Sequence, residues 1–145
     1  MYNIIKHFHS GFRYVVLALI LSAIIGAFMG WLGQKEYSNG NRKLNLFAMI
    51  SLHTQILVGL ILYFISDITK TAFANWGAAM KDATLRYWAL EHLVMMLLAM
   101  IIITIGHSKS KKPNNNKHRT VAIYYTLALI VIVVAILQSG RPLLG

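Results

Sequence analysis

Residues 85 to 105 read LRYWALEHLVMMLLAMIIITI, an apolar run that carries a glutamate and a histidine in its first half. About 20 apolar residues, at roughly 1.5 Å each, cross the hydrocarbon core of a bilayer. An ionisable group at that depth costs about 2–3 kcal/mol on insertion scales, so it calls for a functional partner. The run therefore predicts a transmembrane helix in which Glu91 and His92 carry function.

Three more apolar runs, at residues 11–32, 44–65 and 121–137, accompany this one. The chain of 145 residues is 57% hydrophobic and 12% charged, which is a membrane composition. The first run is longer than the apolar part of a signal peptide, so we expect a retained helix. We predict an all-α fold, a single integral membrane domain over residues 1–145, built as an antiparallel up-down bundle of four transmembrane helices.

Cysteine content and charge exclude several classes of function. Because the chain has no cysteine, it has no disulfides, no thiolate metal sites and no covalent c-type haem. Its net charge is +10, but the basic residues lie in short loops between apolar runs, so we expect no nucleic-acid binding. Eight basic residues fall in the first and third loops and six fall elsewhere, which places those loops in the cytoplasm and both termini outside.

Two local patterns predict how the chain packs and meets the membrane. Ser22, Gly26 and Gly30 recur every fourth residue, which would let another helix approach closely, although glycine is also common in any membrane helix. The connection over residues 66–84 alternates apolar and polar residues and is expected to form a short interfacial helix, with Trp76 at the headgroup level.

Two histidines fall inside neighbouring spans. His53 lies nine residues into the second run, roughly 14 Å from the inner edge, and His92 lies seven residues into the third, roughly 10 Å from the outer edge. In a core about 30 Å thick these levels differ by about 6 Å, so the two side chains are expected to face each other. Two imidazoles in apolar surroundings are the axial ligands that a b-type haem needs, and His53 and His92 are the predicted pair.

Other residues are assigned around this haem. Trp88, Met95 and Met96 share a helix face with His92 and are expected to line the macrocycle. Arg13 and Arg86 are expected near the propionates. His9 is expected to be a hydrogen-bond partner near a quinol or oxidant, or a ligand of a second haem. His107 and His118 are expected to be solvated at the edge of a loop.

Other interpretations of the same residues stay open. The histidines could form only interhelical hydrogen bonds, each worth about 1 kcal/mol. His92 with Met95, Met96 and Met100 also offers the soft ligands that copper prefers. For Glu91, a salt bridge with Arg86 or Arg13 is favoured over a proton relay.

Three segments carry a resemblance to a known family. His9-Ser-Gly-Phe-Arg13, His53-Thr-Gln-Ile-Leu-Val-Gly59, and Glu91-His92 followed by Met96 and Ala99 resemble the small four-helix membrane cytochrome b proteins of bacteria. The resemblance spans nearly the whole chain through short motifs. It implies a multi-pass protein of the bacterial inner membrane that carries b haem and exchanges electrons with quinone or with another membrane or periplasmic redox subunit.

The fourth run departs from the pattern of two-haem relatives, because it has no histidine. One haem is therefore favoured over two. The predicted function is electron transfer, and the rival hypothesis is a haem-free four-helix subunit that anchors or assembles a larger complex.

Overall fold

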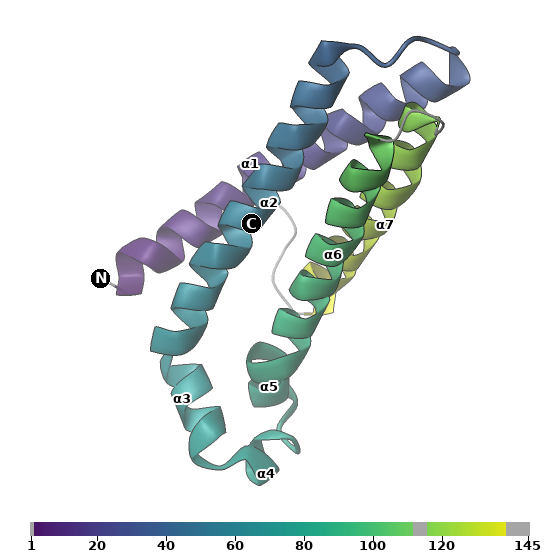
Figure 1. Cartoon of the computed structure of the whole chain (residues 1–145). Helices are drawn as coiled ribbons and strands as arrows, with labels where there is room; N and C mark the ends of the chain where they lie inside the picture. Colours follow the sequence, from purple (N-terminus) through teal and green to yellow (C-terminus); the bar gives the residue numbers. More distant parts are fainter. Residues whose placement is uncertain (1, 112–115, 139–145) are drawn as a thin grey trace.

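Four long helices, each antiparallel to its two neighbours, make up the computed structural model, which describes residues 2–111 and 116–138 (Figure 1). They form a ring in which each helix contacts the next, in the order α1, α2, α6, α7 and back to α1. Four helical segments are long and apolar enough to cross a membrane, so the predicted all-α membrane bundle is confirmed. The helix bounds are Tyr2–Leu32 for α1, Asn39–Ile65 for α2, His92–Ser110 for α6 and Lys117–Gln138 for α7.

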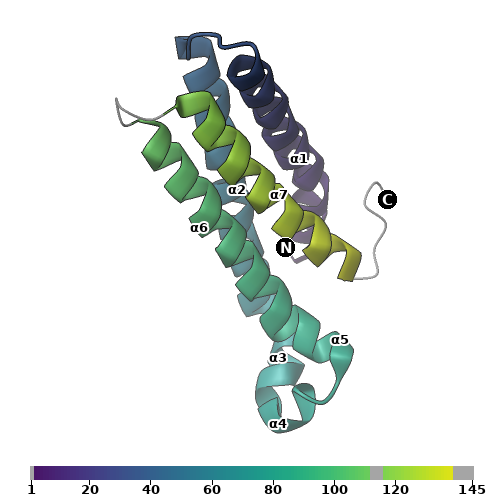
Figure 2. The ribbon, with the colours of Figure 1, turned by 90° about the vertical axis from the view of Figure 1, so that its right-hand side faces the viewer.

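Short helical elements connect α2 to α6 at one end of the bundle, which we name the capped end (Figure 2). Phe73 and Trp76 stack there, with 5.1 Å between ring centroids, and both rings remain exposed. Such exposed aromatic rings are typical of a segment at a membrane interface. The connecting elements are α3 (Asp67–Ala74), α4 (Trp76–Ala79), α5 (Ala83–Arg86) and the π-helical turn η1 (Tyr87–Glu91), which continues into α6.

The opposite end, which carries the two basic loops, is named the basic end. Here α2 begins at a capping box: the Oγ of Ser38 accepts from the backbone N–H of Asn41 at 3.1 Å, and the Oδ1 of Asn41 accepts from the N–H of Ser38 at 3.0 Å. This box satisfies the first backbone donors of the helix, so α2 begins several residues before the predicted apolar run. The α1 helix likewise begins at Tyr2, so it includes His9 and Arg13 from the outset.

Alanines fill much of the interior of the bundle, where they let the helix backbones approach one another. Large apolar side chains such as Leu21, Leu57 and Val94 point outward and are about half exposed, as expected of a surface that faces lipid. The buried alanines of the main core are Ala23, Ala27, Ala48, Ala99, Ala122 and Ala128.

Two glycines mark the closest approaches to α7. A Cβ placed on Gly30 would lie 2.3 Å from Cε1 of His118, and one placed on Gly106 would lie 2.3 Å from Cβ of Tyr124. A Cβ on Gly26 would meet nothing within 4 Å. The predicted small-residue stripe on α1 therefore brings another helix close at Gly30 and not at Gly26.

Candidate functional site

A cavity lies at the capped end, between α1, α2 and the start of α6. Of the four neighbouring helix pairs in the ring, α2 and α6 pack least closely, and the cavity lies between them. The cavity volume is about 160 Å³. Most of its wall surface is apolar and polar side chains provide the rest, which is typical of a ligand site. Its lining residues include Lys6, His9, Gln55, Leu60, Trp88, His92 and Met96.

His9 lines the cavity from α1. Its ring lies over Gly59 of α2, where a Cβ would approach Cε1 of His9 to 3.1 Å. The Nε2 of Gln55 donates a hydrogen bond to the backbone carbonyl of His9 at 2.7 Å. The absent side chain of Gly59 and the amide of Gln55 therefore hold His9 against α2.

His92 lines the same cavity from α6, which is diagonal to α1 in the ring. Its Nδ1 lies 3.3 Å from the hydroxyl of Tyr87. The indole of Trp88 packs against the imidazole, with 5.3 Å between ring centroids. The structure thus brings His9 and His92, from two different helices, to one cavity.

His53 lies elsewhere, toward the basic end. Its Nε2 is 2.8 Å from Oγ1 of Thr104. Thr104 follows His92 by twelve residues on one continuous helix, or about 18 Å. The structure therefore does not bring His53 and His92 together as expected.

An axial displacement of α2 explains this difference. At the basic end α2 extends beyond α6 in both views (Figures 1 and 2). The depth prediction assumed that both helices start from the same membrane edges. The contact of Tyr63 with the backbone carbonyl of Ala89, at 2.5 Å, shows instead that the residues of α2 level with His92 lie well beyond His53.

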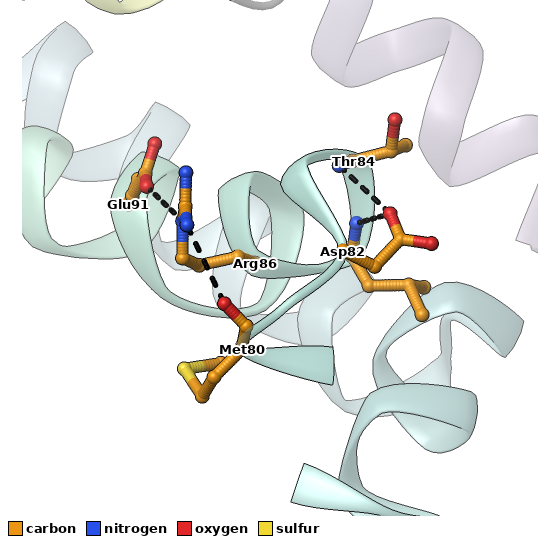
Figure 3. A network of polar contacts seen from close by, with 6 residues as sticks. Met80, Asp82, Thr84, Arg86 and Glu91 are labelled. Carbon is orange, nitrogen blue, oxygen red and sulfur yellow. Dashed lines mark hydrogen bonds and ion pairs between the residues drawn. The ribbon is translucent and has the colours of Figure 1, made fainter. Parts of the chain in front are cut away.

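The two arginines expected near propionates have other partners. Nε of Arg86 lies 2.6 Å from Oε1 of Glu91, and Nη1 donates to the carbonyl of Met80 at 3.4 Å (Figure 3). The predicted salt bridge of Glu91 with Arg86 is therefore confirmed. Nη2 of Arg13 donates to the hydroxyl of Tyr14 at 3.1 Å.

Among the described residues that line the cavity, Lys6 is the cation. Sequence reasoning missed Lys6, although it lies three residues before His9 and so shares its helix face. Trp88 and Met96, which were expected to line a haem, line the cavity, while Met95 is not among its lining residues.

Gln55 is the other residue that sequence reasoning missed. It is only 8% exposed, and its Oε1 has no hydrogen-bond partner within the described part of the chain. A buried acceptor without a partner costs about 1–3 kcal/mol, so this oxygen favours a ligand that donates a hydrogen bond.

His107 and His118 are buried, which corrects the expectation that they are solvated. Both belong to helices, because α6 continues to Ser110 and α7 begins at Lys117. His118 lies 3.2 Å from the carbonyl of Glu36 and packs edge-on against Tyr37. His107 is 2% exposed, and neither of its ring nitrogens has a partner among residues 2–111 and 116–138.

His107→Leu is expected to raise the thermal midpoint of the protein in detergent, because it removes a buried polar ring whose unmet hydrogen bonds cost about 1–3 kcal/mol. His118→Leu is the matched control and is expected to lower the midpoint, since it removes the contact with Glu36. A lower thermal midpoint for His107→Leu would contradict the view that the His107 ring is destabilising, and would indicate that a ligand binds this ring.

Comparisons of the chain with protein-family models, with curated proteins and with solved structures each give no match. The assignment of function therefore depends on the residues of the cavity and on the membrane bundle that holds them.

Proposed function

We propose that this multi-pass membrane protein is a b-type cytochrome that transfers electrons through a haem bound in the cavity at the capped end. The observation that carries the proposal is the placement of His9 and His92 on diagonal helices around one apolar cavity. His92, as expected from the sequence, and His9, in place of His53, would hold the haem iron.

The donor set and the apolar walls of the cavity suit haem b, but its present volume does not. The imidazoles of His9 and His92 would supply nitrogen ligands, and Leu60, Trp88 and Met96 would supply apolar contacts. The present volume is close to that of an apolar cavity of about 150 Å³ that holds benzene. A macrocycle therefore requires α2 and α6 to move apart, and this is the least closely packed pair in the ring.

When bound, haem supplies a one-electron Fe(III)/Fe(II) couple. The chain's own residues hold it, orient it and keep water away. Lys6 provides a positive charge at the cavity for a carboxylate. The salt bridge of Arg86 with Glu91 and the cap of α5 by Asp82 fix the turn that precedes His92 (Figure 3).

The side of the membrane at which electrons are exchanged follows from a proposed orientation of the bundle. The described loops of the basic end carry positive charge, including Lys35 and Lys111, which supports a cytoplasmic location for this end in a bacterial inner membrane. The capped end and its cavity then face outward. Electrons would pass between a quinol and an extracytoplasmic redox partner near that surface.

The direct test is the absorption spectrum of protein purified from cells supplied with haem. We expect a Soret band, a b-type α-band on reduction, and one haem per chain. Protein that stays colourless after reconstitution with haem would overturn the proposal.

A second candidate function follows from the size of the cavity and from Gln55. The cavity has room for one aromatic ring, and the buried Oε1 of Gln55 can accept a hydrogen bond from a hydroxyl on that ring. A quinol headgroup offers such a donor, and its oxidised form does not. The chain would then be a haem-free, quinol-binding subunit of a larger complex.

Titration with a short-chain quinol, followed by tryptophan fluorescence, tests this second function. Gln55→Leu is expected to weaken quinol binding by about 3–10-fold, the value of one hydrogen bond, and to leave binding of the oxidised quinone unchanged. Trp88→Phe identifies the responding indole. Equal affinity of the wild type for quinol and quinone would contradict the role of Gln55.

A further inference from the structure

The turn before His92 has a π-helical geometry. Residues Tyr87–Glu91 form this turn between α5 and α6. In a π-helix the backbone bonds join residues five apart, and such turns occur frequently at functional sites. Two side-chain pairs here have this spacing: Arg86 with Glu91 and Tyr87 with His92.

Within residues 2–111 and 116–138, the hydroxyl of Tyr87 contacts a backbone carbonyl and an imidazole, which have different roles. It donates its one hydrogen to the backbone carbonyl of Ala135 in α7. It also lies 3.3 Å from Nδ1 of His92. Because a phenol has a single hydrogen to give, its oxygen can only accept from His92. Nδ1 of His92 must therefore carry a proton, and in the neutral ring Nε2 carries the lone pair.

His53 has the opposite arrangement. Oγ1 of Thr104 donates its hydrogen to the carbonyl of Met100 at 2.6 Å and lies 2.8 Å from Nε2 of His53. By the same reasoning, Nε2 of His53 must be the donor to Thr104. In their neutral forms, His92 and His53 are thus held in opposite tautomers, each by a hydroxyl group that donates its own hydrogen to a backbone carbonyl.

We propose that Tyr87 is a positioning residue that holds His92 in the Nδ1–H tautomer and presents Nε2 as the ligating nitrogen. Tyr87 is 5% exposed and is anchored to α7, so the hydroxyl has a fixed place. A metal-bound histidine commonly donates its other N–H to such an acceptor, which fixes the ring and raises its basicity. The ligand role of Nε2 rests on the proposed function, whereas the tautomer does not.

The tautomer is measured by ¹⁵N NMR of histidine side chains in haem-free protein in detergent micelles. We expect a protonated Nδ1 for His92 and a protonated Nε2 for His53, with His92→Gln and His53→Gln identifying the signals. Tyr87→Phe is expected to convert His92 to a mixture of tautomers and leave His53 unchanged. Thr104→Val is the matched control and is expected to change His53 alone.

A protonated Nε2 on His92 in the wild type, or no change in Tyr87→Phe, would overturn the proposal. The wild-type spectrum decides the tautomer even if Tyr87→Phe does not fold.

Haem binding gives a separate measurement. Tyr87→Phe is expected to weaken haem affinity by about 10–100-fold. It is also expected to raise the midpoint potential, because a less basic imidazole stabilises the ferric state less. A chain that binds no haem would remove the proposed function, while the tautomer of His92 would still be decided by NMR.

Discussion

His92→Ala and His9→Ala are each expected to abolish the b-type α-band of the reduced, haem-reconstituted protein, while His53→Ala leaves the spectrum unchanged. The reason is position: His9 and His92 line one cavity, whereas Nε2 of His53 is bonded to Thr104 about 18 Å further along α6. With either histidine removed, the chain would hold haem iron through one imidazole only, which would change the b-type spectrum. The measurement is the Soret and α-band intensity per chain after reconstitution with haem.

The control for folding is the helical content and elution volume of each variant in detergent. If His53→Ala loses the spectrum and His9→Ala keeps it, the ligand pair is His53 with His92, as expected from helix depths, and α2 must slide along α6 when haem binds.

Spin labels can measure such a movement of α2 along α6. Because the chain has no cysteine, single cysteines introduced on α2 and α6 would carry the labels at defined positions.

Gly106→Ala is expected to destabilise the bundle by about 1–3 kcal/mol, the usual cost of overpacking a tight contact. The new Cβ would lie 2.3 Å from Cβ of Tyr124, an atom that cannot move without the α7 backbone. The helices must therefore separate. The measurement is the free energy of unfolding in mixed micelles, or the thermal midpoint where unfolding is irreversible.

Gly26→Ala is the matched control. It lies inside a membrane helix, as Gly106 does, but its Cβ would meet nothing within 4 Å. Alanine is the better helix former by about 1 kcal/mol, so this variant is expected to be as stable as the wild type or more so. Equal loss of stability in both variants would show that the close packing of α7 against Gly106 is not the cause of the destabilisation.

Periodicity and hydropathy predicted much of the candidate site. The apolar runs predicted the four spans, and the spacing of Trp88 and Met96 relative to His92 placed all three on one face, where the structure has them. The salt bridge of Arg86 with Glu91 was predicted from charge and proximity, and it is confirmed at 2.6 Å. These features depend on residues close together in the chain.

The partner of His92 could not be predicted in the same way. Helical spacing gives the face on which His53 lies, but it does not give the level at which α2 meets α6. That level depends on how the long connection through α3, α4 and α5 joins the two helices. The burial of His107 and His118 could not be predicted either, because it depends on the bounds of α6 and α7. Both rings lie inside helices that extend beyond the apolar runs.

The sequence by itself determined the four membrane helices, their alternating direction and the side chains that share a face with His92, because hydrophobicity and helical period act along the chain. Only the tertiary structure decided which histidine shares a cavity with His92 and which hydroxyl fixes its tautomer. The first depends on the axial displacement of α2 against α6. The second depends on a hydrogen bond from Tyr87 to Ala135, which are 48 residues apart in the chain and meet only when α7 packs beside the π-helical turn.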